Sequence, residues 1–206
     1  MKLRNLPHRG AQAGFTLVEI LAVIVILSIL MGVLVFSLGN AQGTANEKLT
    51  EARLTAISAA LGTYEGDMGD YPISHFSDVT TSSASATNQG IEALVQALWK
   101  EPMLGLGLSD DILLNTDGDR ANNEPLLEIV DMWDNPIAYF HRTDYGQHQT
   151  YVTQDGETGE DVESDVVARR HPVTDRWANH QKFQLISAGL DGRFGTDDDL
   201  CNFKTE

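Results

Sequence analysis

Cysteine and positive charge are both scarce in this 206-residue chain. The single cysteine, Cys201, excludes an internal disulfide, and we expect it to be a partly buried, small apolar side chain. Lys and Arg number 14 against 30 Asp and Glu, which gives a formal net charge of −16. Such a surface opposes nucleic-acid binding, which needs cationic groups that displace phosphate counterions. We therefore expect no nucleic-acid partner.

Catalytic motifs are missing as well. The sequence has no nucleophile elbow, no phosphate-binding glycine loop and no HExxH pair. Its six histidines are scattered without the spacing of metal ligands, which argues against a zinc site. We therefore predict that the protein is not an enzyme.

A long apolar run dominates the N-terminal region. It extends from Phe15 to Leu38, and its last 19 residues, from Ile20 onward, carry no charge. As a helix those residues would span about 28 Å, close to the hydrocarbon core of a bilayer. Residues 1–14 carry three basic and no acidic side chains, which favours a cytoplasmic N-terminus. The pattern predicts one membrane-spanning helix; a secretory signal would have its small-residue cleavage site after the apolar core.

One carboxylate, that of Glu19, lies inside the apolar segment. A carboxylate in a membrane span costs about 2.5–3.5 kcal/mol on insertion scales, so it usually marks a function. A plain membrane anchor would leave Glu19 unexplained.

The residues around Glu19 form a motif, Gly14-Phe15-Thr16-Leu17-Val18-Glu19. It resembles the prepilin motif shared by type IV pilins and type II secretion pseudopilins. The resemblance implies that a prepilin peptidase cuts between Gly14 and Phe15 and methylates the amine of Phe15. It also implies that Glu19 neutralises the N-terminal amine of a neighbouring subunit during assembly. Pairing the two charges would fix the axial register, because each is costly alone in lipid.

Helical spacing continues beyond the apolar run. Apolar residues between Leu49 and Tyr64 recur on one face, and no proline falls between Leu38 and Pro72. We predict one long helix over about 15–65, with its second half packed on a head domain. A short helix is expected at 90–99, and strands at 149–153 and 183–187 are expected to form a small antiparallel sheet. The predicted fold class is α+β and pilin-like.

Four parts follow from this division. We expect a leader peptide at 1–14, a transmembrane and polymerisation helix at 15–38, its amphipathic continuation at 39–66 and a globular head at 67–206. The family resemblance covers residues 10–100, about 128–140 and 183–200. Stretches 101–127 and 154–180 fall outside it, and we interpret them as insertions, the second without a clear period.

The segment Trp133-Asp134-Asn135-Pro136 precedes a β-prone run. It resembles a family signature in which glycine stands where this chain has Asp134. We expect a structural role, in which Trp133 fills the core of the head and Pro136 helps to turn the chain into a strand.

An acidic, glycine-rich loop follows the last expected strand. Calcium takes six to eight oxygen ligands in irregular geometry, and crowded carboxylates without a cation would repel one another. The stretch resembles the calcium loop of type II secretion major pseudopilins, although a solvated acidic turn is the alternative. The resemblance implies side-chain ligands among Asp191, Asp197, Asp198 and Asp199, with backbone carbonyls near Ala188 and Leu190.

A second oxygen-rich stretch occupies residues 115–119 and is followed by Asn122, Asn123 and Glu124. Arg120 stands where an EF-hand loop needs glycine, so the spacing is not that of an EF-hand. We interpret this stretch as an exposed turn in an insertion, and leave open whether residues 115–124 bind an ion.

Together these patterns predict a structural pseudopilin that carries calcium. The resemblance implies a single-pass protein of the inner membrane, with its head in the periplasm, that polymerises into the periplasmic pseudopilus of a type II secretion system. Implied partners are further copies of the chain, minor pseudopilins, the prepilin peptidase, the inner-membrane assembly platform and the lipid bilayer. The alternative is a type IV pilin for adhesion, motility or DNA uptake, which usually has a C-terminal disulfide. A membrane-anchored protein that never polymerises would keep its N-terminus uncleaved.

Overall fold

The computed structural model of the chain describes residues 15–77, 81, 87–100 and 108–204. Gly14, on the amino side of the expected cleavage site, lies outside these residues. The chain forms two compact units, Met1–Gln42 and Gly43–Glu206. From here on, the name head is used for this second unit, which includes part of the long helix besides the predicted head at 67–206.

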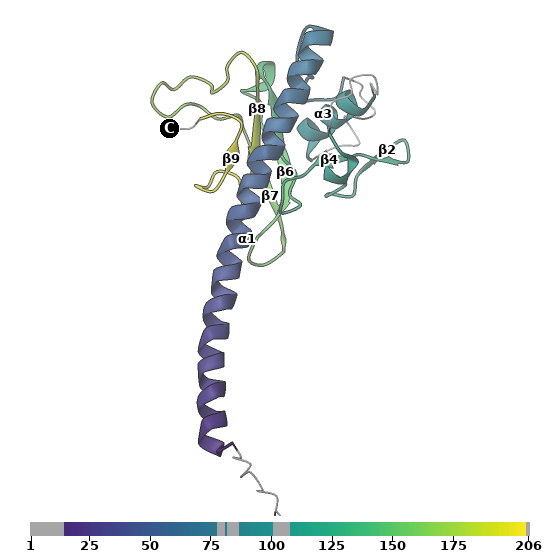
Figure 1. Ribbon diagram of the computed structural model, residues 1–206. Helices are drawn as coiled ribbons and strands as arrows, with labels where there is room; N and C mark the ends of the chain where they lie inside the picture. The colour runs from purple at the N-terminus through teal and green to yellow at the C-terminus, as the bar shows by residue number, and fades with distance from the viewer. Residues whose placement is uncertain (1–14, 78–80, 82–86, 101–107, 205–206) are drawn as a thin grey trace, which may run out of the picture. The chain divides into compact units, whose positions relative to one another are not determined.

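The first unit contains the start of the longest helix, α1 (Leu17–Met68) (Figure 1). A capping box begins it, because Thr16 N donates to the Glu19 carboxylate (2.8 Å) and Glu19 N donates to Thr16 Oγ1 (3.2 Å). Within α1, Leu17–Leu34 is long and apolar enough to cross a membrane, and none of it is buried in the chain itself. A fully exposed apolar helix of this length calls for lipid or protein around it.

The predicted long helix is confirmed and ends slightly later than expected. Its last residue is Met68, and the turn begins at Gly69, whose φ is +85°. Gly69 N donates to Glu65 O (2.8 Å), which closes the helix with a glycine in the left-handed conformation. The short helix is also present, as α3 (Gln89–Lys100).

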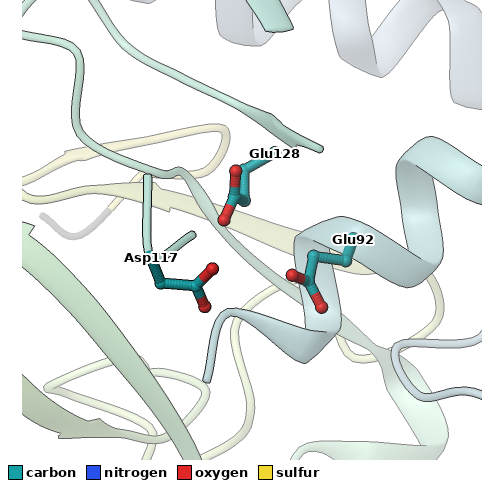
Figure 2. Close-up of side chains that lie close together, drawn as sticks. All are labelled: Glu92, Asp117 and Glu128. Carbon is teal, nitrogen blue, oxygen red and sulfur yellow. The ribbon is translucent and has the colours of Figure 1, made fainter. Parts of the chain in front are cut away.

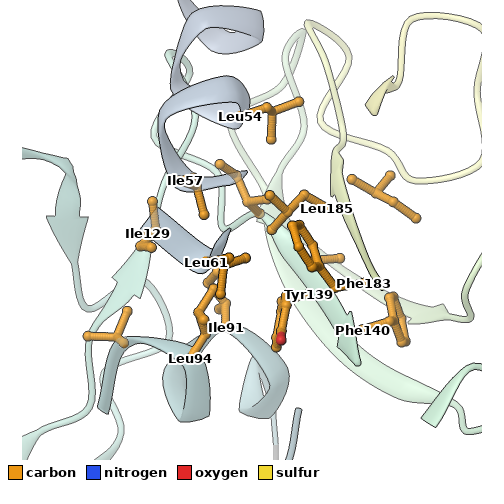
Figure 3. Close-up of a cluster of buried hydrophobic side chains, with 14 of the residues drawn as sticks. Leu54, Ile57, Leu61, Ile91, Leu94, Ile129, Tyr139, Phe140, Phe183 and Leu185 are labelled. Carbon is orange, nitrogen blue, oxygen red and sulfur yellow. The ribbon is translucent and has the colours of Figure 1, made fainter. Parts of the chain in front are cut away.

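The core of the head forms where α1, α3 and the strands meet. Leu54, Ile57 and Leu61 are spaced by three and four residues, so they share one face of α1, and all three are buried. They belong to one cluster with Ile91 of α3 and Leu185 of β8 (Phe183–Ser187) (Figure 3). The amphipathic half of α1 is therefore part of the core of the head.

The strands of the head form small antiparallel sheets. Strand β8 is central in the order β5-β8-β9, while β6 pairs with β7 over six positions. Two further pairs of two residues each join β1 to β4 and β2 to β3. The bounds are β1 Leu113–Leu114, β2 Arg120–Ala121, β3 Glu124–Pro125, β4 Glu128–Ile129, β5 Ala138–His141, β6 Gln149–Gln154, β7 Asp161–Val166 and β9 Leu200–Cys201, with 3-10 helices η2 Asp110–Ile112 and η3 Arg142–Asp144.

Both predicted strands exist, but the expectation that they share one sheet was wrong. Strand β6 pairs with β7, which lies inside the stretch 154–180 that we read as a surface insertion without a clear period. Strand β7 is mostly polar, and only Val166 at its end is buried. A strand with so little buried surface has a weak sequence pattern, because alternation of apolar and polar residues is what reveals a strand.

The expectation that Trp133 fills the core was also wrong. Its side chain is half-buried, and the fully buried aromatic residues of the core are Tyr139, Phe140 and Tyr151. The turn is held through its backbone instead. Buried Asp131 accepts hydrogen bonds from Trp133 N (2.9 Å) and Asn135 N (3.1 Å).

Candidate assembly segment and calcium loop

The start of α1 presents the two side chains that the prepilin motif singles out. Phe15 is 82 % exposed, and Glu19 is exposed as well. The Glu19 carboxylate accepts hydrogen bonds from both Thr16 N (2.8 Å) and Thr16 Oγ1 (2.9 Å). It therefore lies beside the peptide bond that follows the expected cleavage site.

The C-terminal loop leaves β8 and returns to it as β9. Gly189 and Gly192 have φ values of +66° and +68°, in the left-handed region that glycine favours. A Cβ on Gly189 would lie 2.4 Å from the carbonyl oxygen of Asp198, and one on Gly192 would lie 1.9 Å from that of Gln154. Both positions need glycine for close backbone approach.

The loop brings two of the predicted ligands together. Asp191 N donates to Asp198 Oδ2 (2.9 Å), although the two residues are seven positions apart. Asp198 also accepts a hydrogen bond from the hydroxyl of Thr196. These bonds place the side chain of Asp198 over the backbone of Asp191.

Asp199 has different surroundings from Asp191 and Asp198. Its side chain is fully buried, and Oδ2 accepts from Gly195 N (2.8 Å) and pairs with the guanidinium of Arg169. The other oxygen, Oδ1, is buried and accepts no hydrogen bond from a described residue. A buried carboxylate oxygen without a donor is costly, so this position suits a cation or a water molecule.

The remaining predicted ligands lie at the edge of the loop. Asp197 is exposed and forms no hydrogen bond or ion pair with a residue that the structure describes. Ala188 is fully buried, while Leu190 is 53 % exposed and its carbonyl packs against Gly156. Within the described chain, no three of the four aspartates bring carboxylate oxygens within 4.8 Å of one another.

Known proteins share both the N-terminal motif and most of the length of this chain. The family model described as "Prokaryotic N-terminal methylation motif" matches residues 9–35. Type II secretion system core protein G of Pseudomonas aeruginosa is 33 % identical over 161 residues, which cover 77 % of this chain and 96 % of that protein. The chain belongs to the type II secretion system core protein G family.

Two further core G proteins align over almost the whole chain. That of Escherichia coli is 26 % identical over 192 residues, 93 % of this chain and 91 % of its own length. That of Aeromonas hydrophila is 26 % identical over 196 residues, 95 % of each. No solved structure matches the chain. The predicted resemblance to the major pseudopilins is thus confirmed.

In this member of the core G family, the hairpin of β6 and β7 contacts the C-terminal loop. Besides Arg169, which follows β7, Asp155 at the end of β6 pairs with Arg193 of the loop (Nε to Oδ2, 2.9 Å). Hydrogen bonds from Thr158 N and then from Arg193 hold the pKa of Asp155 well below its usual range. Sequence reasoning missed these contacts because no local pattern links residues that lie so far apart in the chain.

Proposed function

We propose that this core G protein is the structural pseudopilin of a type II secretion system. It is made as a prepilin, inserted in the inner membrane through Leu17–Leu34, cut before Phe15 and polymerised into a periplasmic pseudopilus. The observation that carries this proposal is the match to the methylation motif over 9–35, directly ahead of an apolar helix. The role is structural rather than catalytic.

The proposed processing and assembly steps imply several partners. A prepilin peptidase would cut and methylate the chain, and an inner-membrane assembly platform would receive it from the bilayer. Further copies of the chain and minor pseudopilins would surround the apolar surface of Leu17–Leu34, which the chain itself leaves uncovered. Burying that surface among neighbouring helices would stabilise the filament.

Glu19 is proposed as the assembly residue. Among the described residues, only Thr16 donates hydrogen bonds to its carboxylate, at the exposed start of α1. The methylated amine of Phe15 in a neighbouring subunit would replace these neutral donors with a charge, and charge-assisted hydrogen bonds are roughly twice as strong.

Processing and assembly can be tested separately by expression of the full chain with and without a prepilin peptidase. Intact-mass spectrometry should find a mature chain that begins at N-methylated Phe15, only when the peptidase is present. Glu19→Gln should still be cut but should no longer enter sheared filaments, while Ser28→Ala, in the same apolar helix, should assemble normally. A chain that keeps residues 1–14 beside an active peptidase would refute the proposal.

We further propose that the C-terminal loop binds one calcium ion. The support is that the Asp198 carboxylate lies on the backbone N–H of Asp191 and that Asp199 has a buried oxygen without a donor among the described residues. These three carboxylates, with the carbonyls near Ala188 and Leu190, would hold the ion, and Asp197 is the candidate with the least support. Bound calcium would neutralise the charge of the loop and fix its closure against β8.

The calcium proposal is tested by thermal unfolding of the full chain in detergent, with calcium or with chelator. A ligand that binds only the folded state raises Tm, so calcium should stabilise the wild type. Asp191→Asn and Asp198→Asn should each remove most of the calcium-dependent rise in Tm that is due to this loop. Glu160→Gln, which removes an exposed carboxylate from the β6–β7 hairpin, is the matched control and should keep the full rise in Tm with calcium. Equal gains in all four proteins would overturn the assignment.

A further inference from the structure

The second oxygen-rich stretch meets two carboxylates from distant parts of the chain. Glu92 of α3, Asp117 of the loop between β1 and β2, and Glu128 of β4 each offer an oxygen, and these oxygens lie within 4.8 Å of one another (Figure 2). The three side chains point toward a common space in Figure 2. The expectation that residues 115–119 form an exposed turn is therefore wrong for Asp117, which is half-buried.

Burial makes the charge of this cluster costly. Glu92 is 1 % exposed and Glu128 is 0 % exposed. Loss of solvation raises the pKa of Glu128 to about 7, although hydrogen bonds from Thr116 and Asn88 favour its ionised form. Buried carboxylates persist in folded proteins when they are paired or when they bind a metal.

Asp119 adds a fourth carboxylate and an independent indication of a ligand. Both of its oxygens are buried, and neither accepts a hydrogen bond from a described residue. Burial and the charge of Asp117 raise its pKa to about 6, and the side chain of Glu92 lies within its hydrogen-bonding reach. When Glu92 is ionised, the Asp119 side chain faces other carboxylates and has no hydrogen-bond donor among the described residues.

The donors that the described residues offer to Asp117 and Glu128 are neutral. Asn88 Nδ2 donates to Glu128 Oε1 (3.1 Å), and Thr116 N donates to Glu128 Oε2 (3.0 Å). Asp117 accepts from the hydroxyl of Thr87 and from Asp119 N (3.1 Å). Asp117, Asp119 and Glu128 form no ion pair with any described residue. These donors orient Asp117 and Glu128 without neutralising them.

We propose that Glu92, Asp117, Asp119 and Glu128 form a second calcium site, distinct from the C-terminal loop. The donor set consists of oxygen atoms only, which is the preference of a hard cation, and it contains no imidazole or thiolate that would favour zinc. Calcium is favoured over magnesium because it accepts several carboxylates in irregular geometry, whereas magnesium keeps several of its waters.

The site would connect three elements of the head. Glu92 belongs to α3, Glu128 belongs to β4, and Asp117 and Asp119 belong to the segment between β1 and β2. Asn88 extends the connection, since its side chain also accepts a hydrogen bond from Val152 N of β6 (3.0 Å). A bound ion would therefore anchor this segment to α3 and β4, whether or not the C-terminal loop binds calcium.

Calcium stoichiometry tests the proposal on the full chain in detergent, after chelator treatment and titration with calcium chloride. Isothermal titration calorimetry should find two ions per chain in the wild type. Asp117→Asn and Asp119→Asn should each leave one ion, because loss of even an outer-shell partner costs about 10–100-fold in metal affinity. Glu124→Gln removes an exposed carboxylate from β3 and should leave two. Asp198→Asn should also leave one, so the two sites can fail independently.

The Tm of the metal-free protein separates a cation site from a structural hydrogen-bond network. Asp119 accepts no hydrogen bond from a described residue, so Asp119→Asn should have a metal-free Tm equal to or above that of the wild type and a smaller gain with calcium. A metal-free Tm well below wild type would overturn the proposal, as would an unchanged stoichiometry in both Asp117→Asn and Asp119→Asn. Binding of a single ion by the wild type, abolished by Asp198→Asn, would overturn it too.

Discussion

Asp134 shows how one residue can occupy the place of a family glycine. Its φ is +62°, in the left-handed region, where glycine has no steric penalty and Asn or Asp is tolerated best among the other residues. The turn is fixed around it by the hydrogen bonds from Trp133 N and Asn135 N to Asp131. Asp134 thus adopts a conformation that glycine would adopt without a steric penalty.

Asp134→Gly should therefore stabilise the head, by about 0.5–1 kcal/mol, because the left-handed conformation costs roughly 1–2 kcal/mol for an ordinary residue and less for Asp. Asp134→Ala should destabilise it, since alanine has the penalty and no polar side chain for local hydrogen bonds. Urea denaturation of the full chain in detergent measures both. Opposite signs for the two variants are the expected outcome, and equal effects would contradict the backbone explanation.

Asp70, just after the end of α1, forms a pH-dependent ion pair with Arg142. Arg142 Nη2 donates to Asp70 Oδ2 (2.6 Å), and this bond holds the pKa of Asp70 well below its usual range. The ring of His141 and the charge of Glu65 face the same pair. The pair is partly exposed, so its contribution is that of a surface ion pair.

A lowered pKa means that Asp70 stabilises the fold above its ordinary value of about 4 and that this contribution is lost as the pH falls further. Asp70→Asn should lower Tm slightly at pH 7 and lose less stability on acidification than the wild type. Asp67→Asn, an exposed neighbour, should follow the wild type. Parallel Tm curves for Asp70→Asn and the wild type between pH 5 and pH 2 would refute the role of this pair.

At the scale of elements, α1 has two surfaces of different character. Apolar residues from Leu17 to Leu34 are exposed all around the helix, whereas Leu54, Ile57 and Leu61 form a single buried stripe. The first pattern suits a membrane span and the second suits a helix packed on a domain. The same helix therefore has an exposed apolar surface in its first part and a buried apolar stripe in its second part.

The buried stripe of α1 should be sensitive to truncation. Ile57 is 0 % exposed, and Ile57→Ala should cost about 2–5 kcal/mol because it leaves a cavity in the core. Leu49→Ala, at a position 51 % exposed on the same helix, should be nearly neutral. Denaturant unfolding of the full chain in detergent provides the comparison, and similar losses at both positions would contradict the core assignment.

The segment after the β6–β7 hairpin places an arginine guanidinium against the C-terminal loop, where it would compete with a calcium ion. Arg169 pairs with Asp199, one of the proposed calcium ligands. A guanidinium there neutralises the carboxylate when calcium is absent, but it also repels an arriving cation. If the loop binds calcium as proposed, its calcium affinity would therefore depend on Arg169, which follows β7.

Substitution of Arg169 should therefore change the stability of the metal-free protein and the effect of calcium in opposite directions. Arg169→Gln should lower the Tm of the metal-free protein, because Asp199 stays buried without its partner, and should enlarge the rise in Tm with calcium. Arg176→Gln, an exposed arginine of the same segment, is the control. If the calcium-dependent rise is unchanged in Arg169→Gln, Asp199 is not a ligand.

At the scale of the whole molecule, the chain combines an apolar unit with a strongly acidic remainder. The whole chain has a net charge of −16, which favours a dispersed, hydrated surface, while Leu17–Leu34 is apolar and needs lipid or neighbouring helices. Val25→Arg should reduce recovery of the chain in the membrane fraction, since Arg costs about 2.5–3.5 kcal/mol in the middle of a span. Leu49→Arg lies outside the span and should have no such effect. Equal membrane recovery of both variants would argue against a spanning role.

The sequence by itself determined the features that depend on local patterns. The length of the apolar run, the prepilin motif and the spacing of apolar residues predicted α1, α3 and the α+β class, because each pattern reflects contacts between residues close in the chain. The aspartates and glycines after β8 likewise marked a candidate ion loop. Strand β7 was missed because it has little apolar alternation.

Only the tertiary structure decided which side chains meet. It left Trp133 outside the core cluster, paired Arg169 with Asp199, and brought Glu92, Asp117 and Glu128 together from three separate elements. The physical reason is that such contacts depend on how helices and strands pack, and packing at long sequence separation has no periodic signature in the chain. The sequence shows where each carboxylate occurs in the chain. It does not show which neighbouring groups stabilise or repel the charge of that carboxylate.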